Sequence, residues 1–581
     1  MEAQNKICQN CKNSFVIEPE DFSFYEKIKV PPPTFCSECS LIRRMAFRNE
    51  RTLYRRKCQA PGHGEDMLSV FSPDKEATIY CHSAWWGDSW DGLSYGRDYD
   101  FSRNFFEQIN HLWREVPDIG LFNINPVNSD YCSITEGNKN CYLVIGGDFN
   151  EDSLYSAFIF NSKFLVDCYW VSKSEWNYET IDCISCSRLL FSRYCEGCYG
   201  STFMFNCRNC HDCFGCVNLS NRSYCIFNEQ YSKEEYHNKL KEFNISSWKE
   251  LQKIKATFTE FSRKFPRRFA KIIKSVDVTG DDIEESKNCK NSFSIFGGAE
   301  DSKNLWLVYS SVKNCYNIDH SGLSSTDCYE VSSAYPGNKV LFSRFIFEGF
   351  NIEYSYNCHN CSNLFGCIGL RNKQYCILNK QYSKEDYEVL IQKIKAHMND
   401  NKYIDQGGRV YGYGEFFPIE ISPFLYNETV AQELKPISRD EANASGIRLM
   451  ESVDRNYKIT KNMEDLTDTI EKVEDSILDD VISCAHKGSC AHECATAFKI
   501  TKAELEFYRN LKLPLPHLCP NCRHYERISQ RNPMKLWHRS CMCEKKGHIH
   551  EAKCTVEFET SYSPERPEII YCEKCYQQEV I

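Results

Sequence analysis

The sequence predicts a mainly β protein with additional helices, in which a duplicated, Cys-rich β-solenoid of the parallel β-helix type lies between two homologous modules. Two duplications and one recurrent pattern lead to this prediction. Residues 11–58 align without a gap with residues 494–541, so the two ends of the chain are copies of one module. In the middle, residues 206–236 match residues 357–387. Short apolar runs broken by Asn, Ser, Gly and Cys are typical of brief strands joined by tight turns.

These patterns divide the chain into successive segments. We expect an N-terminal module (1–100), a helical or irregular connector (101–137), a first solenoid half (138–231), a helical cap with basic, aromatic helices (232–287), a second solenoid half (288–382), a second cap with a Gly/Pro/aromatic segment and an acidic linker (383–483), and a C-terminal module (484–581). A β-sandwich with Greek-key connections is the alternative to the solenoid.

Helix signals follow each solenoid half. Ser232 and Ser383 each precede an acidic residue by three positions, which is the pattern of a capping box. Residues 246–274 are expected to continue as one or two helices with a buried Phe stripe, which Pro266 should kink or split. The segment 404–430 is expected to be irregular and packed against another part of the protein.

Length and composition exclude several classes of protein. A chain of 581 residues is too long for a single core, and its 35 Cys exceed ordinary usage. The polar start lacks the apolar core of a signal peptide, and no run of about eighteen apolar residues could span a membrane. We therefore expect a cytoplasmic protein with reduced thiols. The net charge of −10 argues against a wholly basic nucleic-acid coat protein but allows local basic patches.

Each end carries two pairs of thiols about two dozen residues apart, the spacing by which a small module holds one tetrahedral Zn²⁺. The predicted N-terminal ligands are Cys8, Cys11, Cys36 and Cys39. The predicted C-terminal ligands are Cys490, Cys494, Cys519 and Cys522, one of which Cys484, His486 or His492 could replace. Four protein ligands leave no open position, so both sites are expected to be structural.

A second metal site follows in each module. The C-terminal copy offers Cys541, Cys543, Cys554, Cys572 and Cys575, together with His548 and His550. The N-terminal copy keeps fewer candidates, namely Cys58, His63, Cys81 and His82. The chain is thus expected to hold at least two Zn²⁺, and four or more if the second sites also bind metal.

One family resemblance supports the zinc prediction. The pattern C-x₂-C-x₃-F-x-I, then F-Y, then P-x₂-C-x₂-C is carried by Cys8, Cys11, Phe15, Ile17, Phe24, Tyr25, Pro33, Cys36 and Cys39. It resembles the small zinc-ribbon (Cys₄) domains of many bacterial proteins, which implies zinc-ribbon or treble-clef-like folds at both ends. The whole chain is similar to multi-zinc, Cys-rich repeat proteins of candidate-phyla bacteria, and this resemblance brings no known activity with it.

The central Cys residues allow two interpretations. The same spacing occurs twice, in Cys207, Cys210, Cys216 and Cys225 and again in Cys358, Cys361, Cys367 and Cys376. These residues could form further zinc clamps between coils. We favour a ladder of buried thiols, because free Cys behaves as a small hydrophobe and stacked coils bring equivalent small side chains together.

A basic segment gives the main functional expectation. It contains Arg43, Arg44, Arg48, Arg51, Arg55 and Arg56 directly after a predicted zinc ligand pair. Such a cluster can neutralise phosphates of RNA or DNA, and it can equally be a solvated helix face balanced by acids elsewhere. The chain has no G-x-S-x-G, H-E-x-x-H, P-loop or G-x-G-x-x-G motif, so an enzyme is the less favoured class.

Three functions are therefore carried forward. The favoured one is a non-enzymatic, multi-zinc scaffold that binds RNA or DNA through the six arginines. The first alternative is a scaffold that binds a protein partner on the solenoid face, since solenoids present long binding surfaces. The weaker alternative is a zinc-dependent hydrolase that uses the C-terminal Cys/His cluster.

Overall fold

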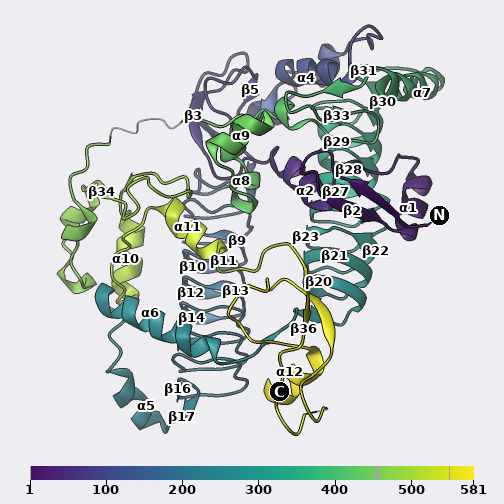
Figure 1. The fold of residues 1–581 in the computed structure, drawn as a ribbon. Helices are drawn as coiled ribbons and strands as arrows, with labels where there is room; N and C mark the ends of the chain where they lie inside the picture. The colour runs from purple at the N-terminus through teal and green to yellow at the C-terminus, as the bar shows by residue number, and fades with distance from the viewer. Residues whose placement is uncertain (1, 452–456, 549, 581) are drawn as a thin grey trace.

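Two β-solenoids form the centre of the protein, which we describe from a computed structural model covering residues 2–451, 457–548 and 550–580 (Figure 1). In the first solenoid, residues twelve positions apart pair in parallel, as Ala157, Tyr169 and Ile181 do. Its strands are β7 (Asn123–Ile124), β8 (Thr135–Glu136), β9 (Ala157–Phe160), β10 (Lys163–Val166), β11 (Tyr169–Ser172), β12 (Glu175–Tyr178), β13 (Ile181–Ile184), β14 (Ser187–Leu190), β15 (Tyr199–Thr202), β16 (Cys225–Ile226) and β17 (Glu229–Gln230). The predicted fold class is confirmed.

A period of three residues underlies these coils. From Ile134 to Phe227 every third residue has a positive φ, and the residue after it faces the interior in all but the last coils, where Arg222 is exposed. Four inward residues therefore make one coil of twelve, as Cys183, Cys186, Leu189 and Ser192 do. Asn, Asp and Gly tolerate the left-handed conformation best and occupy many of the positive-φ positions. Small inward residues let successive coils stack closely.

The second solenoid begins with a shorter coil, which pairs Val276 with Lys287, and continues with thirteen-residue coils, which pair Phe293 with Trp306 and Trp306 with Asp319. Later coils return to twelve residues, as in the pairing of Arg344 with Tyr356. Its strands are β19 (Ile272–Ile273), β20 (Val276–Glu284), β21 (Lys287–Ile295), β22 (Ala299–Lys303), β23 (Trp306–Val308), β24 (Val312–Lys313), β25 (Tyr316–Ser321), β26 (Ser325–Thr326), β27 (Tyr329–Leu341), β28 (Arg344–Glu353), β29 (Tyr356–Phe365), β30 (Gln374–Ile377) and β31 (Lys380–Gln381).

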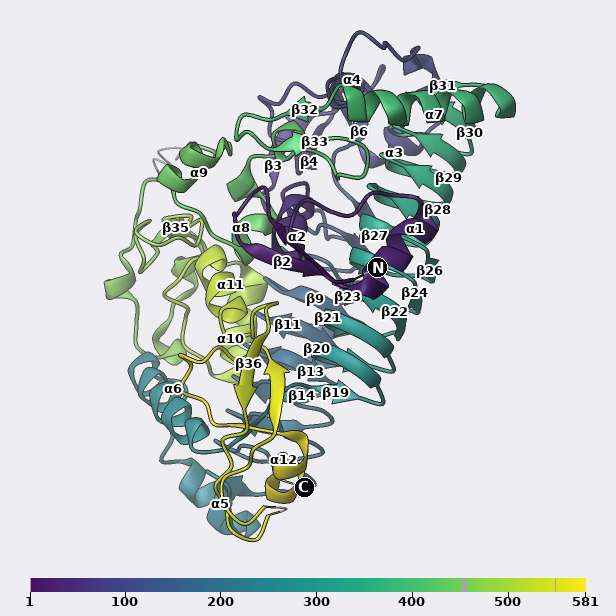
Figure 2. The ribbon, with the colours of Figure 1, turned by 45° about the vertical axis from the view of Figure 1, so that its right-hand side comes forward.

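The two solenoids lie side by side with their axes antiparallel. The first descends in Figure 1 from β9 to β16, and the second ascends from β20 to β31; Figure 2 shows the same order, from β9 to β14 and from β19 to β31. Aromatic side chains join them, because the Trp170 ring lies 4.9 Å from Phe296 and 5.7 Å from Tyr309. The halves do not stack end to end. Both ladders also start earlier than the predicted boundaries of 138 and 288, at Asn123 and Ile272.

Helices follow each solenoid where the capping signals predicted them. Ser232 caps α5 (Lys233–Leu240) and Ser383 caps α7 (Lys384–Asp400), each accepting a backbone N–H. The helix α6 (Trp248–Arg263) buries Leu251, Ile254 and Phe258. The prediction of helix over 246–274 is wrong beyond Arg263, because the chain ends the helix before Pro266 and continues as β18 (Arg267–Arg268) and β19.

The two terminal modules have the same order of elements, a hairpin and two helices followed by a hairpin, a strand and a helix. The N-terminal module contains β1 (Gln4–Ile7), β2 (Ser14–Ile17), α1 (Pro19–Ile28), α2 (Ser37–Met45), β3 (Tyr54–Lys57), β4 (Asp66–Ser69), β5 (Ile79–Tyr80) and α3 (His82–Trp86). The C-terminal module contains β34 (Ile482–Ser483), β35 (Ala497–Phe498), α10 (Lys502–Leu511), α11 (Pro520–Ile528), β36 (Trp537–Ser540), β37 (Glu557–Thr560), β38 (Ile570–Tyr571) and α12 (Glu573–Val580).

Connecting segments complete the fold. η1 (Gly92–Tyr95), α4 (Phe105–Glu115) and β6 (Asp118–Ile119) lead into the first solenoid. After α7 come β32 (Tyr403–Ile404), β33 (Val410–Tyr411), η2 (Ile419–Ile421), η3 (Tyr426–Glu428), α8 (Val430–Leu434), α9 (Arg439–Ser445), η4 (Met463–Asp465), η5 (Ile470–Lys472) and η6 (Asp475–Leu478). Phe416 and Phe417 are buried, as expected for the packed segment 404–430. Across the described residues, every helix is too short or too polar to traverse a lipid bilayer.

Candidate metal centres

The N-terminal module brings its four predicted thiols together. Cys8 and Cys11 lie in the turn between β1 and β2, while Cys36 caps α2 and Cys39 lies in its first turn. Their ligand atoms all lie within 4.8 Å of one another. The Sγ atoms of Cys11 and Cys36 are 3.8 Å apart. A tetrahedral metal with bonds of about 2.3 Å to sulfur requires sulfur–sulfur edges of about 3.8 Å, so the cluster has the size of a Cys₄ metal site.

Hydrogen bonds prepare this cluster for a cation. The backbone N–H of Cys36 donates to Cys8 Sγ over 3.3 Å, and the Asn10 amide donates to Cys39 Sγ over 3.3 Å. Hydrogen bonds from Cys36 and Cys39 hold the pKa of the Cys8 thiol well below its usual value. A thiolate is the form that binds metal, so these contacts favour the liganding state of Cys8.

The equivalent C-terminal cluster consists of Cys484, Cys494, Cys519 and Cys522. Cys519 N–H donates to Cys484 Sγ over 3.3 Å, which repeats the contact between Cys36 and Cys8. Cys484 therefore replaces Cys490 in the predicted four, as the sequence allowed. The cause is a longer loop, because nine residues separate Cys484 from Cys494 in place of two in the N-terminal copy.

The longer loop carries a second group of donors beside this cluster. Cys490 Sγ lies 3.7 Å from Cys522 Sγ, and His486, Cys490, His492 and Cys522 form a set of their own within 4.8 Å. The Nδ1 atoms of His486 and His492 are buried without a hydrogen-bond partner. Cys522 thus belongs to both groups. The predicted ligand Cys490 lies in the second.

Four of the five thiols proposed for a second C-terminal site come together in one cluster. Cys541, Cys554, Cys572 and Cys575 lie within 4.8 Å of one another, and all four are buried. Cys554 Sγ and Cys572 Sγ are 3.9 Å apart, and Cys572 N–H donates to Cys541 Sγ over 3.2 Å. Cys543, His548 and His550 form a neighbouring group that shares Cys575. Several Cys₄ clusters in this chain can therefore hold metal ions.

The second N-terminal group is smaller. Cys81 Sγ lies 3.6 Å from His63 Nδ1, and Cys81 N–H donates to Cys58 Sγ over 3.2 Å. The fourth predicted residue, His82, starts α3 and packs its ring 6.4 Å from Trp86. Glu65, which the sequence analysis did not single out, lies 3.3 Å from His63 Nδ1.

The central thiols are arranged as a ladder inside the solenoids. Cys207 Sγ–H donates to the carbonyls of Phe205 and Cys216, and Cys358 makes the same two contacts with Tyr356 and Cys367. Cys210, Cys216, Cys225, Cys361, Cys367 and Cys376 also lie at inward positions and are buried. The C-x₂-C spacing of these residues follows from the three-residue period of the coils. A zinc knuckle is not needed to explain it.

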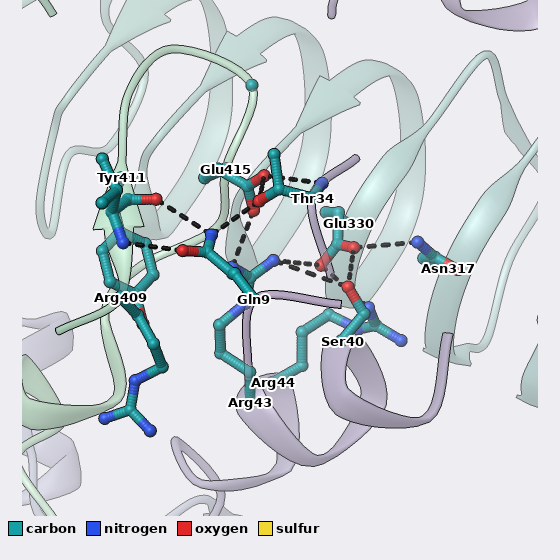
Figure 3. Close-up of polar contacts among 12 residues, drawn as sticks. Gln9, Thr34, Ser40, Arg43, Arg44, Asn317, Glu330, Arg409, Tyr411 and Glu415 are labelled. Atoms are coloured by element: carbon teal, nitrogen blue, oxygen red, sulfur yellow. Dashed lines mark hydrogen bonds and ion pairs between the residues drawn. The ribbon is translucent and has the colours of Figure 1, made fainter. Parts of the chain in front are cut away.

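Four of the six predicted nucleic-acid-binding arginines are inside the protein. Arg43, Arg44, Arg48 and Arg56 are 4, 1, 2 and 9 % exposed. Arg43 bonds Glu415 (Figure 3) and stacks 4.0 Å from the Phe35 ring. Arg44 donates to Asp319 and to Glu330.

The other arginines of this segment differ in exposure. Arg48 pairs with Glu50 and contacts His320, and Arg56 donates to the Ser72 carbonyl. The partly buried Arg51 lies 3.5 Å from Glu433. Arg55 alone among the six is exposed, and it donates to the Tyr131 hydroxyl. The segment therefore serves mainly to attach the module to the second solenoid, through buried carboxylates that are distant in sequence.

Comparisons with known proteins identify no family. No family model matches the chain, and no curated protein matches it. A solved structure from Desulfovibrio desulfuricans G20, described as a "putative acetyltransferase", aligns with 52 % of this chain and 79 % of its own at 10 % identity and a TM-score of 0.12. A likeness this weak supports no argument about fold or function.

Proposed function

We propose that this protein is a zinc-stabilised, non-enzymatic scaffold whose terminal modules brace two antiparallel solenoids and leave the outer solenoid faces free for a protein partner. The observation that carries this proposal is the position of the arginines. A guanidinium that already bonds a buried carboxylate cannot also neutralise a phosphate without breaking the module–solenoid contact. The basic segment is thus better explained as an internal clamp than as a nucleic-acid surface.

Zinc is proposed from the donor set. Four thiolates at tetrahedral spacing suit Zn²⁺ or an iron–sulfur cluster. The sulfur–sulfur distances of 3.8 to 4.0 Å within these clusters fit a single central ion with bonds of about 2.3 Å. We expect the purified chain to contain several zinc ions and to lack the visible absorption of an iron–sulfur cluster. Iron with that absorption would overturn the assignment of zinc.

The free surface also favours a protein partner. One side of the first solenoid is exposed in six of seven successive coils, at Phe149, Asn161, Lys173, Ser185, Asn209 and Asn221. This side carries acids and bases together: Glu136 and Lys173 are exposed, and Arg208 lies 3.7 Å from Glu196. A nucleic-acid surface gathers positive charge, whereas a mixed surface with scattered apolar groups is typical of protein contacts.

The exposed side includes two large apolar residues, Phe149 at 58 % and Ile184 at 40 % exposure. Replacing both by Asp should abolish binding of a partner that docks there, while metal content and folding stay unchanged. A control is Val276→Asp, which changes an even more exposed apolar residue (68 %) on the second solenoid. If the double variant and the control lose partner binding equally, or if neither loses it, the partner does not dock on this side.

The experiment that separates scaffold from nucleic-acid binding is a titration of labelled single-stranded RNA, single-stranded DNA and duplex at two salt concentrations. If the protein is a scaffold, we expect it to bind these nucleic acids only weakly, and we expect Arg55→Glu to leave that binding unchanged. Tight binding that falls steeply with salt, and that Arg55→Glu weakens, would favour the nucleic-acid function instead, because phosphate contacts release counterions. The hydrolase alternative has less support, since four thiolates fill the second C-terminal site.

A further inference from the structure

The second metal group of the N-terminal module can be compared with its C-terminal counterpart position by position. In each module a hairpin, β3–β4 or β36–β37, supplies the first ligands. Cys58 N–H donates to the Glu65 carbonyl over 3.0 Å, and Cys541 N–H donates to the Val556 carbonyl over 2.8 Å. Cys58 therefore corresponds to Cys541, and Glu65 corresponds to Val556.

The same register identifies the next ligand. Two residues before Glu65 is His63, and two residues before Val556 is Cys554. His63 thus occupies the place of the C-terminal thiolate Cys554. An imidazole is as good a zinc ligand as a thiolate, so this exchange preserves the site.

The last two positions come from a short strand and the helix after it. Cys81 N–H donates to Cys58 Sγ over 3.2 Å, and Cys572 N–H donates to Cys541 Sγ over 3.2 Å. Cys81 and Cys572 are therefore equivalent. Three residues further on, the C-terminal helix supplies Cys575, whereas the N-terminal helix has Ala84. A methyl group offers no donor, so the fourth thiolate is missing.

From this correspondence we propose that Cys58, His63 and Cys81 bind a metal ion whose fourth position stays open to water or to a small external anion. The distance of 3.6 Å between Cys81 Sγ and His63 Nδ1 supports a shared ion. Bonds of about 2.3 Å to sulfur and about 2.05 Å to nitrogen give a tetrahedral edge of about 3.6 Å. Three protein ligands and one exchangeable position distinguish this centre from the three Cys₄ centres.

Glu65 stands beside the open position. Its Oε1 lies 3.3 Å from His63 Nδ1, and its side chain is 54 % exposed. A solvated carboxylate is a harder and more easily displaced zinc ligand than a thiolate. Glu65 can therefore cover the ion, but water or an external anion can displace it. The consequence is a faster exchange of this metal than of the metals held by four thiolates.

Competition with a colorimetric chelator tests the proposal on the zinc-loaded full-length chain. We expect one zinc per chain to leave at least tenfold faster than the others. Ala84→Cys restores the missing thiolate and should move this zinc into the slow phase. Cys81→Ser should remove the fast zinc and leave the slow ones. A single release phase in the wild type, or an unchanged fast phase in either variant, would overturn the proposal.

A second measurement tests the open position itself. After Co²⁺ replaces zinc, azide should change the visible absorption of the wild type and leave that of Ala84→Cys unchanged. His82→Ala is the matched control, because His82 is the other nearby imidazole; its azide response should equal that of the wild type. An azide response that persists in Ala84→Cys, or that His82→Ala alters, would show that the open position is not where Ala84 lies.

Discussion

Arg527 donates a hydrogen bond from Nη1 to Asp167 Oδ1 at 2.5 Å, across 360 positions of the chain. Arg44, the matching residue of the N-terminal module, bonds Asp319 in the second solenoid at the same distance, from Nε. All four side chains are at most 4 % exposed. Each module is thus attached to a different solenoid through guanidinium–carboxylate contacts that are shielded from water, and these two arginines take part in them.

Removing the carboxylate of such a pair should be costly. Asp167 accepts from both Arg523 and Arg527, so Asp167→Ala leaves two buried guanidiniums with fewer partners. We expect the free energy of unfolding, measured with urea on the metal-loaded protein, to fall by about 3–5 kcal/mol. Glu260→Gln removes the exposed partner of Arg263 and should cost less than about 0.5 kcal/mol. Equal costs for both variants would contradict the clamp.

The thiol ladder makes a different prediction for the central Cys residues. Cys207 and Cys210 bond backbone carbonyls in the interior, so replacing both by Ser should leave the metal content unchanged. Stability should fall by roughly 1–3 kcal/mol, because hydroxyls replace larger, less polar thiols. Cys519→Ser should instead lower the metal content by one ion per chain. Loss of metal from the double variant, measured by elemental analysis, would establish a site inside the solenoid.

Sequence reasoning identified the modules and the solenoid but did not foresee that four of the six arginines are buried. The modules were visible because their Cys residues and framework repeat along the chain. The basic segment was ambiguous, because Arg44 has the same sequence neighbours whether it meets a phosphate or Asp319, 275 positions away. The three-residue period was present in the sequence as recurrent Ser, Asn and Cys, and it would have explained the central C-x₂-C spacing.

Antiparallel packing of the solenoids could not be predicted, because it depends on contacts such as Trp170 with Phe296 that no local pattern reveals. The choice between Cys484 and Cys490 was likewise undecided, since a nine-residue loop can return either thiol to the cluster. Both features depend on tertiary packing, which the spacing of residues along the sequence does not determine.

The assignment of Cys484 to the first C-terminal centre has its own test. Cys484→Ser removes a thiolate from the cluster with Cys494, Cys519 and Cys522, so this metal should bind at least tenfold more weakly. Cys490→Ser should leave that affinity unchanged, because Cys490 belongs to the group with His486 and His492. Chelator competition on each variant measures both affinities. The reverse order of effects would restore Cys490 to the first centre.

His359 should remain neutral in the folded protein at any pH near neutrality. Burial lowers its pKa to about 3, with a smaller contribution from Arg371, and its ring packs against Trp86 and Phe347. The unfolded chain binds this proton near pH 6.5. Between pH 6.5 and 3 the unfolded state therefore binds more protons than the folded state. The free energy of unfolding should fall as the pH falls through this window, and His359 should account for roughly 2–4 kcal/mol of the decrease.

Two-dimensional NMR of the imidazole protons, with His359→Asn to assign the signal, measures the pKa of His359 directly. The folded protein should show no titration of this signal above pH 5. The variant should also lose less stability on acidification than the wild type. A midpoint near 6.5 would mean that the tryptophans of the N-terminal module do not cover this face of the solenoid.

Withdrawal of the metal ions should release the modules and spare the solenoids. The interior of each solenoid is built from its own stacked side chains, such as Ile318 and Val331 in the second, and contains no ligand of the terminal Cys₄ centres. Trp85 is fully buried four residues after Cys81, so loss of the module structure should expose it. We expect a strong chelator to shift Trp fluorescence to longer wavelength while far-UV circular dichroism keeps its β signal, and added zinc to reverse the shift. If the β signal is lost together with the fluorescence shift, the metal centres also stabilise the solenoids, because the modules and the solenoids then unfold as one cooperative unit.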